Sequence, residues 1–339
     1  MARSGATALS KVSVQKLMRP DRWPAVLIVC AVPLMALTTP PSRLARSGLN
    51  IPPTQEIFSP PSSELLPAAT TVRVAAIQCY SHPGRIRANR SMLAAKIREA
   101  AAKGARLIVV PECAVQGYMN PVDDARWARI PEPDDGELDV SLVAETVPGA
   151  STRHFSELAR EVEAWLAISL IEVEGESFYN TLVLIDPRGL IAAKHRKRSL
   201  WMHGDSGWAS VGDGRAVVAK TPYGRVGLMI CHDLHAMPPI LKNAGVEIVL
   251  YSVGWYGANT ASWFGSIFPE RYVTPNGMAV VAANWSRDAE SGKWQGQGYS
   301  TIYSRDGKVL AQAKDDRCEI IYADLPCSKS ESVKEVNDE

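Results

Sequence analysis

The chain has 339 residues, a formal net charge of +1 and 46% hydrophobic residues. This length and composition indicate one large globular domain or two small ones with a full apolar core. The near-neutral charge gives no sign of a nucleic-acid partner, and six scattered cysteines are too few for a disulfide framework. No Cys-x-x-Cys pair suggests zinc, and neither GxxxxGK[ST] nor GxGxxG after a strand suggests a phosphate-binding loop.

The N-terminal segment has the pattern of an export signal. Four basic residues between Lys11 and Arg22 precede an uncharged, apolar run over residues 23–37. A basic flank before a short apolar run is typical of a signal peptide, whereas a membrane-spanning helix needs about 20 apolar residues. We expect residues 1–38 to be a signal peptide or a single membrane anchor. The protein is then exported (periplasmic or secreted) or anchored facing outward, rather than cytoplasmic.

Composition divides the remainder of the chain into three parts. Residues 39–69 are rich in Pro and Ser, which is typical of an extended linker without a core. Residues 327–339 are polar and charged, and we expect a disordered tail. The folded domain is therefore predicted over residues 70–326.

The first half of this domain alternates strands and helices. An apolar, β-branched run predicts a strand over 72–80, and an Ala-, Lys- and Arg-rich stretch with an apolar stripe predicts a helix over 89–105. A continuous apolar run predicts a strand over 106–112, and a Ser/Thr cap opens a helix over 151–164. Strands flanked by helices indicate a buried sheet with helical cover.

The second half contains more strands. Two follow the helix, with a turn over 186–189 in "DPRG", and we predict the others from apolar runs bounded by turn residues. These are strands over 190–197, 224–231, 246–255 and 277–285, a short helix over 238–244, and a hairpin over 299–313. Since some strands adjoin helices and others adjoin strands, we expect an α/β fold with mixed sheets.

Three predicted strands end in chemically capable residues: Glu112, Lys197 and Cys231. Strand ends of α/β sheets are where sites are built. A carboxylate can take the proton of a thiol as the sulfur attacks, and a lysine can stabilise the anion that forms. Each residue alone has a structural alternative, as a packed cysteine, a loop carboxylate or a solvated basic turn. Together they suit covalent attack on a carbon bonded to nitrogen.

These residues lie in segments that resemble the nitrilase, or carbon–nitrogen hydrolase, superfamily. The matching segments are "VRVAAIQCY", "AAAKGARLIVVPECAVQGY", "NTLVLIDPRGLIAAKHRKRSLW" and "TPYGRVGLMICHDL", with "AANW" and "GYS" nearer the end. The resemblance covers about residues 72–325. It implies a four-layer α-β-β-α sandwich with mixed β-sheets, assembled as a homodimer or larger homo-oligomer, that needs no metal or organic cofactor.

The resemblance also implies roles for the three residues. Cys231 would attack the substrate carbon, while Lys197 and the backbone N–H of His232 would stabilise the tetrahedral intermediate. Glu112 would be the general base, and would protonate the leaving nitrogen before it activates water. A thiolate nucleophile would make Cys231 reactive below the pH of about 8.5 at which a free thiol ionises.

The chain departs from the family pattern at several positions. Asp205 stands where many members have a second glutamate, and it is one methylene shorter. His232 follows the cysteine where many members have an aromatic or another residue. The stretch "DLHAMPP" lacks the usual Arg-Phe-Pro-Glu ending, and "RYVTPNG" over 271–277 replaces the usual start of a helix. We therefore expect unusual substrate contacts just after Cys231.

Other residues have weaker assignments. Aromatic residues could line the acyl pocket, with Trp255 the best placed; the others are Tyr118, Trp201, Trp208 and Trp263. Cys79 and Cys113 are interpreted as packing residues, the latter because neighbours on a strand face opposite ways. Cys318 and Cys327 could pair in an oxidising compartment, although two free thiols are preferred. A metal site or a Cys–His pair built on His232, Asp233 and His235 ranks below the Glu–Lys–Cys arrangement.

The predicted function is hydrolysis of a non-peptide carbon–nitrogen bond in a small amide or carbamoyl compound. Amide is preferred to nitrile because Asp233 takes the second position after the cysteine, as in many family amidases. Nitrile hydrolysis and acyl transfer on the same three residues are the alternatives. A catalytically silent binding protein with this fold is the alternative from another class. The partner is a small-molecule, amide-type substrate, with no nucleic acid.

Overall fold

Two β-sheets pack face to face in the computed structural model, which describes residues 55–56, 70–118, 139–202, 204–255, 260–287 and 296–327. The predicted targeting segment, residues 1–38, lies outside these ranges. Within the described ranges, each helix falls short of the length and apolarity needed to cross a bilayer.

The first sheet has six strands in the order β13-β2-β3-β4-β5-β6. Its strands are β2 (Thr71–Gln78), β3 (Leu107–Val109), β4 (Trp165–Glu174), β5 (Ser177–Ile185), β6 (Ile191–Arg196) and β13 (Glu319–Pro326). The strands β2, β3 and β4 are parallel, while β13, β5 and β6 pair antiparallel with their neighbours. The sheet is therefore mixed, as predicted.

The second sheet has seven strands in the order β1-β7-β8-β9-β10-β11-β12. Its strands are β1 (Gln55–Glu56), β7 (Val217–Thr221), β8 (Gly224–Ile230), β9 (Ile248–Ser252), β10 (Ala279–Ala283), β11 (Thr301–Tyr303) and β12 (Val309–Gln312). The strands β8, β9 and β10 are parallel, and β11–β12 form the predicted hairpin. Strand β1 pairs with β7 and falls in the stretch predicted as linker.

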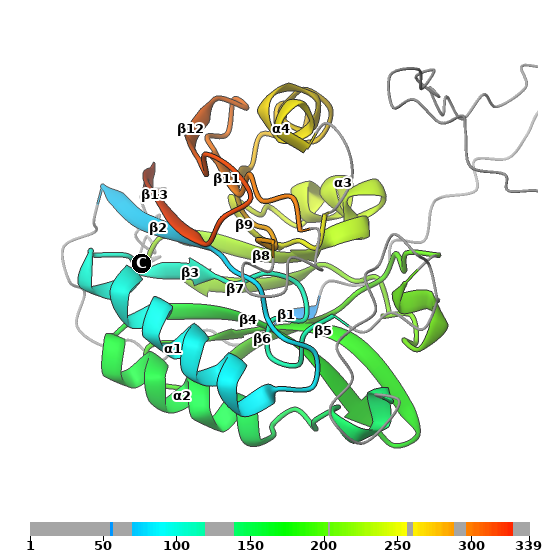
Figure 1. Ribbon diagram of the computed structural model, residues 1–339. Helices are drawn as coiled ribbons and strands as arrows, with labels where there is room; N and C mark the ends of the chain where they lie inside the picture. The colour runs from blue at the N-terminus through cyan, green and yellow to red at the C-terminus, as the bar shows by residue number, and fades with distance from the viewer. Residues whose placement is uncertain are drawn as a thin grey trace, which may run out of the picture. The chain divides into compact units, whose positions relative to one another are not determined.

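Helices cover the outer face of each sheet (Figure 1). The helices α1 (Ile86–Ala102) and α2 (Ala150–Val162) cover the six-stranded sheet. On the other side lie α3 (Met237–Asn243) and α4 (Thr260–Ser262), the latter continued by π-helical turns over Trp263–Ile267 and Pro269–Val273. The four-layer α-β-β-α sandwich is confirmed. Short 3₁₀ turns occur at Val140–Leu142, Asp205–Gly207 and Cys231–His235.

Strand β2 shows how the sequence builds these layers. Val72, Val74 and Ala76 point into the core between the two sheets. Ala75 and Ile77 point to the opposite side, into the core under α1 and α2. Because both faces are buried, the strand is a continuous apolar run. Each fully buried aliphatic side chain of the size of valine or leucine contributes about 1.5–3 kcal/mol.

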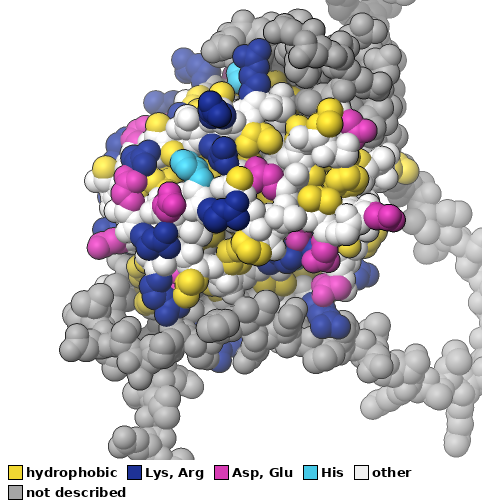
Figure 2. All heavy atoms as spheres, turned by 90° about the horizontal axis from the view of Figure 1, so that it is seen from below, with side chains coloured by type: hydrophobic (Ala, Val, Ile, Leu, Met, Phe, Trp, Pro, Cys, Tyr) yellow, Lys and Arg dark blue, Asp and Glu magenta, His cyan; other side chains and the backbone are white. Residues whose placement is uncertain are grey.

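The outer face of the α1–α2 layer carries basic and acidic side chains side by side (Figure 2). Arg98 of α1 and Glu161 of α2 form one pair across the two helices, with 2.6 Å between Nε and Oε1. Both side chains are about half exposed, so the pair contributes little to stability.

Most predicted elements are present with shifted ends. Helix α1 begins at Ile86, three residues before the predicted start, and β3 ends at Val109, three residues before Glu112. Strands β7 and β13 were not predicted. In β13 only Ile321 and Leu325 are fully buried, so the strand lacks the continuous apolar run that marks the central strands.

Candidate active site

The seam between the two sheets brings Glu112, Lys197 and Cys231 together. Glu112 lies in a turn after β3, Lys197 directly follows β6, and Cys231 directly follows β8. The Glu112 N–H donates to the Val253 carbonyl, which ties the glutamate turn to the end of β9 in the other sheet (3.2 Å). The three residues thus come from strand ends, although Glu112 is not itself in a strand.

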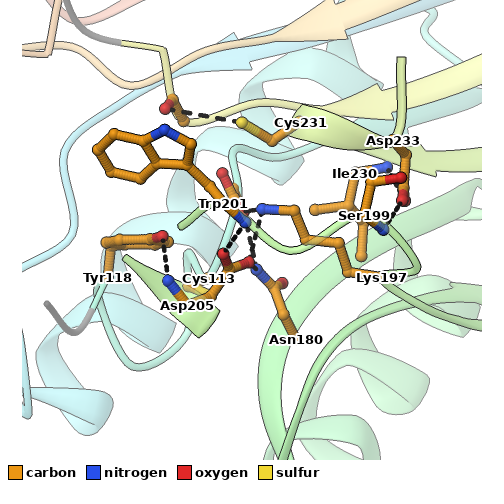
Figure 3. A network of polar contacts seen from close by, with 12 residues as sticks. Cys113, Tyr118, Asn180, Lys197, Ser199, Trp201, Asp205, Ile230, Cys231 and Asp233 are labelled. Carbon is orange, nitrogen blue, oxygen red and sulfur yellow. Dashed lines mark hydrogen bonds and ion pairs between the residues drawn. The ribbon is translucent and has the colours of Figure 1, made fainter. Parts of the chain in front are cut away.

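Lys197 and Asn180 both donate to the carboxylates of Glu112 and Asp205, so the four side chains form one hydrogen-bonded group (Figure 3). The Lys197 ammonium lies 2.7 Å from Glu112 Oε1 and 2.6 Å from Asp205 Oδ2. Asn180 Nδ2, from β5, donates to the same two oxygens at 2.7 and 3.0 Å. Lys197, Glu112, Asp205 and Asn180 are all at most 1% exposed. With both carboxylates ionised, this buried group carries one positive and two negative charges.

The shorter Asp205 reaches Lys197 because a 3₁₀ turn presents it. The residue opens the turn Asp205–Gly207, and its Oδ1 accepts a hydrogen bond from the Trp201 N–H (2.7 Å). Its own N–H donates to the Tyr118 hydroxyl (3.0 Å). Two of the weaker predictions, Asp205 and Tyr118, therefore lie in the site.

Burial and the excess of negative charge in this group shift the pKa values of Glu112 and Lys197. Burial, aided by the nearby Asp205 carboxylate, raises the pKa of Glu112, and the opposing effects of Lys197 and Asn180 do not cancel this. Burial alone would lower the pKa of Lys197, but Glu112, Cys231 and Asp205 raise it well above its usual value. Lys197 therefore stays a cation, and Glu112 is the group best able to accept a proton.

Cys231 occupies a strained position between strand and helix. It is the first residue of the 3₁₀ turn Cys231–His235 and has a φ of +39°, which a non-glycine residue adopts only at a cost. The first N–H groups of a helical turn have no acceptor within that turn, so the His232 N–H is suited to an anion beside the sulfur. Outliers of this kind are enriched at functional sites.

The Cys231 thiol is protonated at rest. Burial and the nearby Glu112 carboxylate raise the pKa of Cys231, against the opposing effect of Lys197. Its Sγ faces the Gly254 carbonyl at 3.8 Å. The resting site therefore holds a thiol whose proton Glu112 would have to take as the sulfur attacks. The expected reactivity of Cys231 below pH 8.5 stays a prediction.

Gly254 lies close to both the thiol and the glutamate. A Cβ at this position would lie 2.5 Å from Glu112 Oε2 and 2.2 Å from the ring of Trp285. The Trp285 indole donates in turn to the Glu112 carbonyl (2.8 Å) and packs edge-to-face on Tyr118. Only glycine fits between Glu112 and Trp285.

Asp233 fixes the backbone on both sides of the site. Its Oδ1 accepts from the N–H groups of Arg198 and Ser199 (2.9 and 2.8 Å), which follow the lysine. Its Oδ2 lies 2.8 Å from His195 Nε2. Because Asp233 is fully buried, these bonds are shielded from water and hold the Lys197 loop against the Cys231 turn. His195 and Asp233 are thereby engaged with each other rather than with the thiol.

Five rings near the site contact one another in sequence, from His232 to Trp255. His232 and His235 meet edge-to-face at 4.6 Å, and His235 continues to Tyr272 at 6.1 Å. Tyr272 and Trp263 are 6.2 Å apart, and Trp263 stacks on Trp255 at 4.7 Å. His232 follows the cysteine, and Trp255 follows Gly254. We call these five residues the aromatic row.

The two histidines of the aromatic row are uncharged at neutral pH. Burial, with a further effect of Lys197, lowers the pKa of His232. Burial and the neighbouring His232 lower the pKa of His235. His235 contacts the Tyr272 hydroxyl through Nδ1 (3.4 Å). The contacts described for it do not include Cys231, so the structure gives no support to a Cys–His pair.

A small pocket is bordered by Glu112 but not by the thiol. It is lined by Tyr80, Ser81, Pro83, Glu112, Gly117, Tyr118 and Trp285. Since neither Lys197 nor Cys231 borders it, we place the reacting substrate carbon at the thiol and not in this pocket.

Several residues lie outside the reacting group. Cys79 and Cys113 are buried, as predicted, but Cys113 lies in the turn after β3 with a φ of +49°, so the strand-alternation argument for it was wrong. Cys318 and Cys327 are both free thiols. Across the described ranges, no cluster of three or more His, Cys, Asp or Glu side chains could hold a metal ion.

Asn180, Gly254 and Trp285 were not assigned to the site from the sequence. Asn180 carried at most a weak signal, because β5 also contains Ser177, Tyr179 and Thr181. Gly254 and Trp285 depend on the approach of two sheets that are far apart in sequence, so only the fold could reveal them.

Comparison with known proteins identifies the family. The carbon–nitrogen hydrolase family model matches residues 73–335. The omega-amidase NIT2 of Homo sapiens is 29% identical over 250 residues, which are 70% of this chain and 83% of that protein.

Two solved structures share the fold. An amidase from Nesterenkonia sp. AN1, in complex with acrylamide, is 20% identical, with a TM-score of 0.63 over 78% of this chain and 94% of its own. Saccharomyces cerevisiae Nit3, a member of branch 10 of the nitrilase superfamily, is 24% identical, with a TM-score of 0.62 over 76% of this chain and 91% of its own. The chain belongs to the carbon–nitrogen hydrolase family and is an enzyme that acts on carbon–nitrogen bonds other than peptide bonds.

Proposed function

We propose that the protein hydrolyses a small amide through an acyl-enzyme on Cys231. The observation that carries this proposal is the buried group in which Lys197 is shared between Glu112 and Asp205, next to a thiol at a strained strand end. One cation shared by two carboxylates leaves Glu112 with a raised pKa and therefore able to take the thiol proton.

The first half of the reaction forms a thioester. Glu112 accepts the Cys231 proton as the sulfur attacks the amide carbon. The negative charge that develops on the carbonyl oxygen is stabilised by the Lys197 ammonium and the His232 N–H. Glu112 then gives its proton to the leaving nitrogen, the carbon–nitrogen bond breaks, and ammonia or an amine departs.

The second half regenerates the enzyme. Glu112 takes a proton from water, the hydroxide attacks the thioester carbon, and a carboxylic acid leaves as the Cys231 thiol is restored. Asp205 and Asn180 hold Lys197 and Glu112 in place throughout, and neither group exchanges a proton in these steps. Glu112, which activates the water, also lines the small pocket described above.

An amide substrate is favoured over a nitrile or acyl transfer to another nucleophile. The relatives that match over most of this chain are named omega-amidases, and the Nesterenkonia protein is named an amidase. The discriminating measurement is ammonia release by the purified protein from a panel of amides and nitriles. We expect release from amides, and release from nitriles alone would support the nitrile alternative.

The covalent step is tested on the same panel. Cys231→Ala should release no ammonia, whereas Cys327→Ser, which alters a thiol outside the site, should match the wild type. Mass spectrometry of wild type quenched during turnover should show an acyl group on the peptide that contains Cys231. Equal ammonia release by Cys231→Ala and wild type would rule the mechanism out.

The aromatic row suggests which acyl group binds. Its rings are uncharged at neutral pH, and its end members directly follow Cys231 and Gly254 in the chain, so they suit a planar, uncharged acyl group. We expect a higher kcat/KM for benzamide than for succinamic acid, whose carboxylate lacks a cation in this row. Trp263→Ala should lower kcat/KM for benzamide more than for acetamide. Preference for succinamic acid would contradict this assignment.

A further inference from the structure

Two cysteines lie just beyond the paired ends of β2 and β13. The antiparallel register runs from Thr71↔Pro326 to Gln78↔Glu319, so one further step along both strands would put Cys79 opposite Cys318. The two thiols are also close enough to interact electrostatically. Opposed residues of antiparallel strands have Cα atoms about 4.5–5.5 Å apart. Disulfides span Cα distances of about 4.4–6.8 Å, so this pair lies within bonding range without movement of the backbone.

Both sulfurs face the same side of the sheet. On β2 the alternation that directs Ala75 and Ile77 toward α1 also directs Cys79 there. On β13, Ile320 and Tyr322 pack against the same core, and Cys318 continues their period of two.

A lysine of α1 stands over this cysteine pair. The Lys96 side chain is within hydrogen-bonding reach of the Cys318 sulfur. Lys103, the residue that directly follows α1, has its ammonium 5.3 Å from the centre of the Tyr322 ring, so the end of α1 lies beside β13. The thiolate is the form of a cysteine that attacks a disulfide, and an ammonium next to the sulfur can donate a hydrogen bond to it.

We propose that Cys79 and Cys318 are a redox modification site that closes as a reversible disulfide with a small-molecule disulfide such as oxidised glutathione. Cys318 is exposed and reacts first, while Cys79 is 1% exposed and reacts second. The Cys318 thiolate attacks one sulfur of the oxidant and expels one glutathione thiolate. Cys79 then loses its proton, attacks the mixed disulfide at the Cys318 sulfur and expels the second glutathione. The two protein thiols are oxidised and the oxidant is reduced to two thiols.

The same geometry excludes the pairing suggested by sequence proximity. Cys318 and Cys327 stand just before and just after β13, nine residues apart along an extended strand. At about 3.3 Å per residue their Cα atoms are about 30 Å apart, far beyond disulfide range. They could pair within one chain only if β13 left the sheet.

The disulfide would fasten the last strand next to the active site. The Cys79 carbonyl accepts the Ser286 N–H (3.2 Å), and Cys79 pairs with Trp285, whose indole donates to the Glu112 carbonyl. Because a disulfide between distant residues restricts the unfolded chain, the oxidised protein should unfold at a higher temperature than the reduced protein.

The test is peptide mapping of the full chain after exposure to oxidised glutathione. Free thiols are alkylated in denaturant, and trypsin with glutamyl endopeptidase then separates Cys318 from Cys327, since Glu319 lies between them. We expect peptide 74–85 linked to the peptide that begins at Cys318, in wild type and in Cys327→Ser. The link should be absent in Cys318→Ser, and dithiothreitol should remove it.

Two further readouts test the mechanism. The melting temperature should rise on oxidation in wild type and Cys327→Ser but not in Cys318→Ser. Lys96→Gln should slow formation of the link, because it removes the cation beside Cys318. The proposal is overturned if Cys79 remains fully alkylatable after oxidation, or if Cys318 is found linked to Cys327 instead.

Discussion

Glu112 and Glu172 are both 1% exposed and both lie 2.7 Å from a lysine ammonium, yet their acidities move in opposite directions. The pKa of Glu112 is raised by burial and by Asp205. Burial also acts to raise the pKa of Glu172, but hydrogen bonds from Arg196, Lys194 and Thr181 outweigh it and lower the pKa overall.

The difference comes from the number of charges around each carboxylate. Glu172 faces two cations, Lys194 and Arg196, and accepts a hydrogen bond from the Thr181 hydroxyl (2.7 Å). Glu112 shares its one cation with a second carboxylate. A buried carboxylate with surplus positive charge is a fixed structural anion, whereas one with too little remains able to accept a proton.

The largest difference between the two glutamates is expected when each is replaced by glutamine. Glu112→Gln should lower kcat/KM for an amide by about 10²–10⁴-fold, because it removes the proton acceptor and leaves the shape of the side chain. Glu172→Gln should leave kcat/KM near that of the wild type. The measurement is steady-state ammonia release, with circular dichroism to confirm that both variants are folded. A comparable loss of kcat/KM in the two variants would mean that charge balance does not separate their roles.

Gly254→Ala should displace Glu112 and leave Glu172 in place. The added methyl group would meet Glu112 Oε2 and the Trp285 ring, so one of them must move. A shift of about 1 Å in a catalytic group can cost about 10²-fold in rate, and overpacking costs about 1–3 kcal/mol of stability. Kinetics and chemical denaturation measure the two effects. A fully active Gly254→Ala would show that Glu112 need not be held where the structure has it.

The smallest expected effect lies on the Glu172 side. Because the folded-state pKa of Glu172 is lowered, its stabilisation is present above the unfolded pKa of about 4.3 and is lost as the pH falls through the folded value. Glu172→Gln should therefore lower the free energy of unfolding at pH 7 by about 1–3 kcal/mol, since Lys194 and Arg196 lose their buried acceptor. The difference in the free energy of unfolding between wild type and Glu172→Gln should become smaller at acidic pH. Urea denaturation at pH 7 and pH 3.5 measures it, and a gap that widens in acid would contradict the assignment.

The layered fold was predictable because its central strands are apolar on both faces. Runs such as those of β4 and β8 have few alternatives to burial in a sheet, and the residues that end them drew notice as polar exceptions. Strand β13 was missed since its inward residues alternate with polar ones. Its position at the edge, beside β2, is fixed by tertiary pairing.

The reacting residues of the site were predictable from the sequence, but the balance of charge among them was not. Glu112, Lys197 and Cys231 each follow an apolar run, and a family resemblance placed them in order. The sharing of Lys197 between Glu112 and Asp205, and the bridging Asn180, depend on distances of 2.6 to 3.0 Å between residues up to 85 positions apart. No local pattern specifies such distances.

The central claim is that the uncompensated charge of Asp205 keeps Glu112 ready to accept the Cys231 proton. The most direct test is the pH dependence of acyl-enzyme formation on Cys231, followed by mass spectrometry in single turnovers of wild type and Asp205→Asn. Asp205 raises the pKa of Glu112, so its neutral replacement should move the acid limb of the profile to lower pH. An acid limb that stays in place, or moves to higher pH, in a folded Asp205→Asn protein would contradict the account.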